Sequence, residues 1–237
     1  MALTAVSWAA PGPPPAGPPD EMGLRQRKKQ LMRQQLSDTA TEMFLDRGFD
    51  AVRVVEIAEA CGVSEKTVYN YFPNKESLLL DRWGTTIESL RAGLADPHVS
   101  PVQAAVRILD DELRGVTFWF TAQDDPAAGY ALFLRFGAMI NSTPALRSYQ
   151  HDMTDQLITV AAEVLAERIE VDSNDAEVQI AATALIGLWN VQFQSLRKHL
   201  DGNLSPRDVH RAVVDDVERA ARLIDTGLQS LEQVEEL

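Results

Sequence analysis

Four side chains with the chemistry to read nucleic-acid bases lie between residues 65 and 70. Lysine can donate to O6 and N7 of guanine, asparagine can bracket adenine, glutamate can accept from N4 of cytosine, and a tyrosine ring can pack on the methyl group of thymine. If the segment is a helix with Val68 and Phe72 facing a core, its opposite face presents all four together. The candidate base contacts are Glu65, Lys66, Tyr69 and Asn70.

Other residues nearby carry hydroxyl groups or cations that suit the flanking phosphates. Residues 25–29, with the sequence RQRKK, hold four cations just ahead of the base-reading candidates, although a solvated helix start would have the same composition. The chain has a net charge of −13, but residues 24–80 hold nine Lys or Arg against eight Asp or Glu, so the acidity belongs to the remainder of the chain. The candidate phosphate contacts are Lys28, Lys29, Arg53, Thr67, Tyr71 and Lys75.

Apolar periodicity predicts three helices that would position these side chains. The first ends at Gly48, and a short second helix ends at Gly62. Cys61 is expected to pack in the second helix as a small buried hydrophobe. Ser64 should cap the third helix, because a serine oxygen can accept from the first free N–H groups. Two helices joined by a tight glycine-containing turn form a helix-turn-helix unit, whose second helix enters the major groove of DNA.

The run GFDAVRVVEIAEACGVSEKTVYNYFPNKESLL, residues 48–79, resembles the DNA-binding domain of the tetracycline-repressor (TetR) family. The resemblance implies an all-helical dimer, in which a small N-terminal domain binds DNA and a larger variable domain senses a small molecule and dimerises. The positions that match the family pattern are Gly48, Phe49, Ile57, Ala58, Gly62, Val63, Ser64, Thr67, Tyr69, Tyr71, Phe72, Asn74, Lys75, Glu76 and Leu78.

Two positions depart from the family pattern. Arg53, preceded by Val52, stands where the family usually has a hydroxyl residue that opens the second helix and touches phosphate. Arginine could hold the phosphate by its charge, and Asp50 could then serve as the helix cap. Cys61 replaces a common alanine, which is a modest change in volume.

The chain divides into three segments. Residues 1–22 are rich in proline and are expected to form a disordered tail, residues 23–80 the helix-turn-helix domain, and residues 81–237 the effector-binding and dimerisation domain. In the last segment, Ser100 and Pro101 form a helix start signal. Further helices are predicted at about 126–141, 144–169, 174–200 and 206–231, so the fold class is all-α.

The last two predicted helices are the longest periodic segments of the chain. In the TetR family, the last two major helices of each subunit usually form a four-helix dimer interface. Periodicity does not separate an interface residue from a core residue, so both fates stay open for the candidates. They are Ile180, Leu185, Val213, Val217 and Ala220, together with Trp189 and Leu223.

Aromatic and polar side chains in the second domain could line an effector pocket. Arg135 is a further polar candidate to orient a ligand. An acidic domain favours an apolar or cationic effector over an anionic one. The pocket candidates are Trp83, Trp119, Phe133, Phe136, Asn141, Trp189 and Phe193, although most such residues are expected in the plain core.

Sequence motifs argue against an enzyme. The chain has no G-x-S-x-G, P-loop, G-x-G-x-x-G or H-E-x-x-H motif, and its single cysteine and scattered histidines have no metal-ligand spacing, so no catalytic residue, cofactor or metal is predicted. The expected compartment is the cytoplasm, without membrane attachment. The sequence predicts a ligand-responsive regulator that binds a pseudo-palindromic operator as a homodimer. The alternative is a DNA-binding activator or architectural protein without a ligand.

Overall fold

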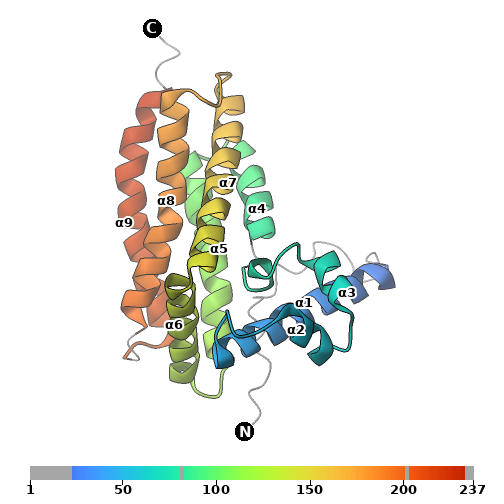
Figure 1. Cartoon of the computed structure of the whole chain (residues 1–237). Coiled ribbons are helices and arrows are strands. Elements are labelled where there is room, and N and C mark those ends of the chain that lie inside the picture. Colours follow the sequence, from blue (N-terminus) through green and yellow to red (C-terminus); the bar gives the residue numbers. More distant parts are fainter. Residues whose placement is uncertain (1–22, 81–82, 201–202, 233–237) are drawn as a thin grey trace. The chain divides into compact units, whose positions relative to one another are not determined.

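The computed structural model describes residues 23–80, 83–200 and 203–232. These residues form nine α-helices and one short 3-10 helix, and no strand occurs among them, so the predicted all-α fold class is confirmed (Figure 1). The elements are α1 (Leu24–Arg47), α2 (Val54–Ala60), α3 (Glu65–Tyr71), η1 (Glu76–Leu78), α4 (Trp83–Ala95), α5 (Pro101–Thr121), α6 (Pro126–Ser142), α7 (Pro144–Arg168), α8 (Ala176–His199) and α9 (Pro206–Glu232). The predicted Pro-rich tail lies outside the described residues.

The helices group into two compact units. The N-terminal unit contains the described residues 23–80 together with residues 135–150, and the C-terminal unit contains the described residues from 83 to 134 and from 151 onward. The chain therefore changes unit three times, between residues 80 and 83, between residues 134 and 135, and between residues 150 and 151. The sequence predicted a single boundary between the two domains, after residue 80, and the structure adds two more, within α6 and α7.

The N-terminal unit is built around a core that α1, α2 and α3 share. Leu36, Phe44, Ile57 and Phe72 are fully buried in it. As predicted, α1 ends before Gly48, whose φ of 89° is a left-handed conformation that glycine adopts at little cost.

The turn between α2 and α3 has the predicted helix-turn-helix geometry. Gly62 has a φ of 68°, so a residue with a Cβ atom would be strained there. Ser64 Oγ accepts a hydrogen bond from the Thr67 N–H at 3.1 Å, which confirms Ser64 as the cap of α3. Cys61 is half-buried rather than buried, because it follows the last turn of α2 at the edge of the core.

In the C-terminal unit, α5 packs against α4, α8 and α9, and α8 packs along α9 (Figure 1). The predicted start signal of α5 is confirmed: Ser100 Oγ accepts from the Gln103 N–H at 3.1 Å, and Pro101 is the first helical residue. α8 and α9 are linked through Asp216, which accepts from Ser195 Oγ at 2.7 Å and lies 3.0 Å from His199 Nε2.

The structure shows which of the interface or core candidates on α8 and α9 are buried within a single chain. Leu185, Val213 and Val217 are buried within the single chain and belong to its core. Ile180 and Leu223 are instead exposed, at 66% and 81%. Trp189 and Ala220 are half-buried.

Neither a bilayer-spanning helix nor a metal-binding cluster is found in the described part of the chain. None of its helices has both the length and the apolar character needed to cross a membrane. The same residues include no group of three or more His, Cys, Asp or Glu side chains arranged to hold a metal ion.

Candidate nucleic-acid interface

The four candidate base contacts lie on the exposed face of α3. Glu65, Lys66, Tyr69 and Asn70 are all exposed, with 47% of Tyr69 accessible. Val68, on the other face of the helix, is 1% accessible. The core therefore fixes the rotation of α3 about its axis. The exposed face of the helix carries a carboxylate and an amide oxygen as acceptors, an ammonium and an amide group as donors, and an aromatic ring.

The candidate phosphate contacts differ in how exposed their side chains are. Lys28 and Lys29 are exposed near the start of α1, and the Arg53 side chain is 77% exposed. Thr67 is half-buried, and its hydroxyl shares a hydrogen bond of 2.8 Å with Ser64 Oγ. The Tyr71 ring is also half-buried and packs against the core of the N-terminal unit.

Lys75 is drawn into the N-terminal unit rather than extended from it. Its Nζ donates to the Phe49 carbonyl at 2.5 Å and lies 4.3 Å from the centre of the Phe49 ring. Desolvation by burial lowers the pKa of Lys75 below its ordinary value, although the nearby carboxylates of Asp50 and Glu76 act to raise it. An ammonium group has three N–H donors, so Lys75 can bond to the Phe49 carbonyl and still donate to a phosphate. The phosphate contact of Lys75 stays a prediction. Its structural contact with Phe49 was not revealed by the sequence.

The start of α2 is capped by Glu56 and not by Asp50, the residue that sequence reasoning offered. Glu56 Oε2 accepts from the Arg53 N–H at 2.8 Å, while Oε1 accepts from Arg47 Nη2 at 2.7 Å. These bonds, led by that from Arg47, lower the pKa of Glu56 from 4.5 to about 2. The spacing of Arg53 and Glu56 matches the second half of a capping box and was visible in the sequence.

Replacing Glu56 with glutamine should reduce the acid sensitivity of the N-terminal unit. A carboxylate with a lowered pKa stabilises the fold above its unfolded-state pKa, and this contribution is lost as the pH falls from about 4.5 toward about 2. The free energy of unfolding, measured by urea titration near pH 6 and near pH 3, should therefore fall less in Glu56→Gln than in the wild type.

Glu59→Gln is the matched control for this measurement. Glu59 is an exposed carboxylate on the same helix, with no side-chain hydrogen bond or ion pair within the described part of the chain. If Glu59→Gln flattened the acid response as much as Glu56→Gln, the assignment of the cap would be wrong.

Two arginines missed as structural residues hold parts of the N-terminal unit. Arg33 Nη1 donates to the Tyr71 carbonyl at 2.6 Å, and its guanidinium lies 4.5 Å from the centre of the Phe72 ring. Arg135, considered above as a ligand contact, donates from Nη2 to the Leu45 carbonyl at 2.8 Å. Both contacts join residues far apart in the chain, so local sequence spacing could not reveal them.

Three of the pocket candidates meet in an aromatic cluster of the C-terminal unit. The Phe133 ring centre lies 5.9 Å from that of Phe120 and 6.2 Å from that of Phe193. Tyr130 and Trp119 contact Phe120, at 4.8 and 5.4 Å. These five residues, from α5, α6 and α8, are called the aromatic cluster below. Phe133 is 7% accessible, whereas Trp119 and Phe193 are half-buried.

Two other pocket candidates, Trp189 and Phe136, have contacts outside this cluster. Trp189 Nε1 donates to Glu112 Oε2 at 3.0 Å, and Glu112 Oε1 accepts from Thr86 at 2.7 Å. Phe136 packs against the core of the N-terminal unit, and Asn141 is exposed in that same unit. The side chain of Trp83 lies outside the described part of the structure.

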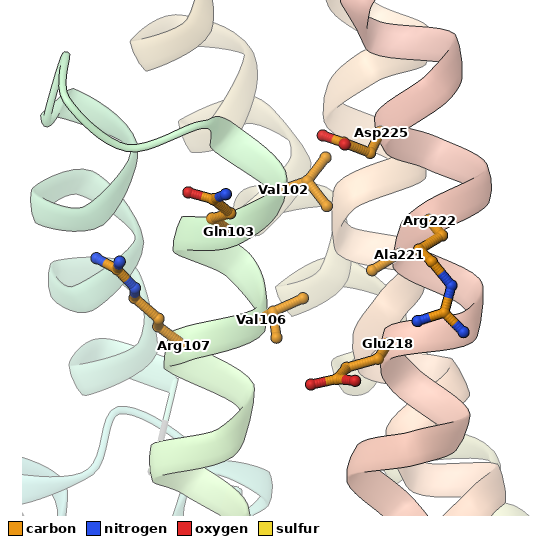
Figure 2. A pocket seen from close by; sticks show the side chains of 8 residues that line it. All are labelled: Val102, Gln103, Val106, Arg107, Glu218, Ala221, Arg222 and Asp225. Atoms are coloured by element: carbon orange, nitrogen blue, oxygen red, sulfur yellow. The ribbon is translucent and has the colours of Figure 1, made fainter.

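An open groove of about 320 Å³ lies between α5 and α9. In Figure 2, Val102 and Val106 point from α5 toward α9, and Glu218 points from α9 toward α5. No pocket candidate from the sequence lines this groove. Its lining residues are Val102, Gln103, Val106, Arg107, Glu218, Ala221, Arg222 and Asp225.

Both parts of the chain match known domain families. Residues 36–81 match the family model of bacterial regulatory proteins of the tetR family, and residues 134–229 match the model of the MftR C-terminal domain.

Curated relatives and a solved structure are similar over most of the chain. The HTH-type transcriptional regulator TcmR of Streptomyces glaucescens is 30% identical in an alignment of 167 positions that covers 66% of this chain and 69% of TcmR. A protein of Mycobacterium tuberculosis described as a mycofactocin biosynthesis transcriptional regulator, MftR, is 27% identical over 162 residues, covering 68% of this chain and 78% of MftR. The structure of NalD, a Pseudomonas aeruginosa repressor, aligns with a TM-score of 0.49 and 20% identity over 81% of this chain and 97% of NalD.

Proposed function

Because the chain belongs to the TetR family of DNA-binding transcriptional regulators, we propose that it is a ligand-responsive repressor that binds a pseudo-palindromic operator as a homodimer. The observation that carries this proposal is the exposed face of α3, behind which Val68 is buried. Glu65, Lys66, Tyr69 and Asn70 read the bases, and Lys28, Lys29, Arg53, Thr67, Tyr71 and Lys75 hold the phosphates. The protein then works in the cytoplasm, beside the DNA.

The proposed dimer is supported by apolar surface that a single chain leaves uncovered. Ile180 on α8 and Leu223 on α9 are large apolar residues that are mostly exposed. Gly187 and Leu223 both lie about two helical turns from the Ser195–Asp216 hydrogen bond, so they are at similar heights along the paired helices. A side chain at Gly187 would meet only open space, which leaves room for a partner's side chain. In this proposal Ile180 and Ala220 are interface residues.

The proposed effector is a small, largely apolar molecule that contacts the aromatic cluster. Trp119 and Phe193 are only half-buried there, so an apolar ligand would gain by covering them. Binding can release DNA only if the ligand prefers a conformation in which the two recognition helices are wrongly spaced. The coupling between such sites is typically ~1–3 kcal/mol, or about 5–150-fold in affinity.

In this mechanism, α4 carries part of the signal from the C-terminal unit. Arg91 of α4 pairs with Glu163 of α7 at 2.9 Å, and Arg168 of α7 donates to the Val99 carbonyl just beyond α4, at 2.9 Å. Thr86 bonds to Glu112 of α5. A shift of α5 or α7 on ligand binding would therefore move α4.

A disulfide between α4 and α5 should weaken ligand-induced release of DNA. A Cβ atom placed on Gly93 would lie 3.6 Å from the Ala104 Cβ, which is within the range of disulfide-bonded cysteines. Oxidised Gly93→Cys/Ala104→Cys, prepared with Cys61→Ala to remove the natural thiol, should bind DNA but lose most of the ligand response. The reduced form of the same variant is the control. A full ligand response in the oxidised form would exclude movement between α4 and α5 from the mechanism.

The proposed function is tested by sequencing the genomic DNA fragments that the purified protein retains at moderate salt. A few fragments that share an inverted repeat are expected, and the genes beside them indicate which ligands to try. Asn70→Ala should retain fragments with a changed base at one position of each half-site, because each contacted base pair contributes ~1–3 kcal/mol. Retention without a shared sequence would instead support an architectural protein, the alternative given by the sequence.

A further inference from the structure

The groove between α5 and α9 lies wholly within the C-terminal unit and has an apolar floor. Val102 and Ala221 are buried, and Val106 is half-buried. Figure 2 shows the two valines directed from α5 toward α9, with Ala221 on the α9 side of the gap. The groove volume of about 320 Å³ falls within the range of sites that hold small molecules.

Two carboxylates stand at the ends of this floor. Glu218 and Asp225 are seven residues apart on α9, so they lie on the same side of the helix with their Cα atoms about 10 Å apart along its axis. Both carboxylates are directed toward α5 in Figure 2. The order along the groove in that view is Asp225, Val102, Ala221, Val106 and Glu218. The groove is therefore an apolar strip with a carboxylate at each end.

Neither of these carboxylates has a partner within the described ranges. The side chains of Glu218 and Asp225 form no hydrogen bond or ion pair there, although Asp225 is half-buried. Asp216 on the same helix, by contrast, accepts from Ser195 Oγ at 2.7 Å. A carboxylate that loses water without gaining a donor is destabilised. A cationic donor placed at each end of the groove would supply the missing hydrogen bonds.

Two arginines also line the groove, and they do not neutralise its carboxylates. In Figure 2, Arg107 is directed away from α9. Neither Arg107 nor Arg222 forms an ion pair with any other residue that the structure describes. Arg222 lies between Glu218 and Asp225 in the sequence of α9, so its charge opposes a cationic occupant rather than attracting one.

We propose that this groove is a second small-molecule site, separate from the aromatic cluster, and that it binds a linear aliphatic diammonium compound. The alkyl chain covers the valines and Ala221, and its two ammonium groups donate to Glu218 and Asp225. An extended chain of about eight carbons spans the distance between the carboxylates. The acidity of the C-terminal segment adds a long-range attraction for a dication.

The site leaves the proposed dimer interface free. Leu223 and Asp225 are two residues apart on α9, so their side chains point to nearly opposite sides of the helix. A ligand in the groove and a partner subunit on Leu223 would therefore not compete for the same surface. Binding in the groove also requires no DNA, so it can be measured whether or not an operator is known.

The first test titrates the full chain with 1,8-diaminooctane at low salt by isothermal calorimetry. We expect saturable binding of one molecule per chain, with a dissociation constant of roughly 1 mM or tighter. Two probes are controls: 1,4-diaminobutane is too short to reach both carboxylates, and 1-aminooctane has a single ammonium. Each should bind at least about fivefold more weakly. Equal affinity for the short diamine would show a general attraction of cations to an acidic protein and would overturn the proposal.

The second test removes the charges of the groove one at a time. Glu218→Gln and Asp225→Asn should each weaken binding of 1,8-diaminooctane about fivefold, and Arg222→Gln should tighten it. Asp215→Asn is the matched control, because Asp215 is an exposed carboxylate of α9 that does not line the groove and has no side-chain partner in the part of the chain described. If Asp215→Asn weakened binding as much as Asp225→Asn, the groove would not be the site.

Sedimentation of the double variant Glu218→Gln/Asp225→Asn tests whether a protein occupies the groove instead. Both are substitutions at the surface, so the variant should fold as the wild type does, and its oligomeric state should be unchanged. A changed oligomeric state with unaltered diamine binding would assign the groove to a contact between subunits and would overturn the proposal. Because neither test uses DNA, such a failure would leave the proposed regulatory function unaffected.

Discussion

A double variant, Ile180→Arg/Leu223→Arg, is expected to be monomeric and to lose specific DNA binding. Both side chains are mostly exposed in the single chain, so the substitutions should leave its fold unchanged. In a symmetric dimer, each substitution places a cation in both copies of the same interface, where burying unpaired charge is costly.

The expected loss of affinity is large because one recognition helix reaches only half of the operator. Specific binding commonly exceeds non-specific binding by ~10³–10⁷, so a monomer should lose about a thousandfold or more. Sedimentation would give the oligomeric state, and fluorescence anisotropy on a selected duplex would give the affinity.

Val171→Arg is the control for added charge. Val171 is another exposed apolar residue, 42% accessible, but it lies between α7 and α8 and outside the proposed interface. This variant should stay dimeric and bind DNA at least as well as the wild type. A double variant that remained dimeric would place the subunit interface elsewhere on the protein.

Phe72→Ala should unfold the N-terminal unit or leave it only marginally folded. Phe72 is fully buried, and truncation of such a residue typically costs ~3–5 kcal/mol. The Arg33 guanidinium would also lose its aromatic partner, and the cap that Arg33 provides on the Tyr71 carbonyl would lose its support. Since whole domains are stable by only ~5–15 kcal/mol, a small unit has little reserve.

Urea unfolding followed by circular dichroism should show this loss as an early transition, while the C-terminal unit unfolds as in the wild type. Tyr69→Ala is the control, because it truncates an exposed ring on the same helix. It should change stability by no more than about 0.5 kcal/mol, yet weaken DNA binding. Wild-type stability in Phe72→Ala would contradict the assignment of this ring to the core.

Local features of the sequence were sufficient to predict the helix-turn-helix. Gly48 and Gly62 end helices because their left-handed conformations exclude most other residues, and Ser64 caps α3 through a bond to Thr67 that spans three residues. The cap of α2 has an equally local signal, because Glu56 is a carboxylate three residues after Arg53. The family pattern has its capping residue at position 53, so the search for a substitute considered only the residues before the helix and offered Asp50. That prediction was wrong, because the residue that caps the Arg53 N–H is Glu56.

Other features depend on packing between distant segments and could not be read from periodicity. Leu185 is buried and Ile180 is exposed, although both are apolar residues on α8. The packing of α8 against α5 and α9 decides which of them a single chain covers. Likewise, Phe133 and Phe136 are neighbouring aromatic residues on α6, but they contact different cores. The predicted pocket therefore combined residues that the fold keeps in separate units.

The core of the N-terminal unit also includes Ile140 of α6 and Leu146 of α7, which has a practical meaning for protein engineering. Chimaeras can be built that join the DNA-binding domain of one such regulator to the effector-binding domain of another. A single junction near residue 80 would put foreign residues in place of Ile140 and Leu146 in the hydrophobic cluster that also contains Phe44 and Phe72. A chimaera that keeps this core intact must include residues 135–150 together with the helix-turn-helix domain, so the exchangeable unit is discontinuous in sequence.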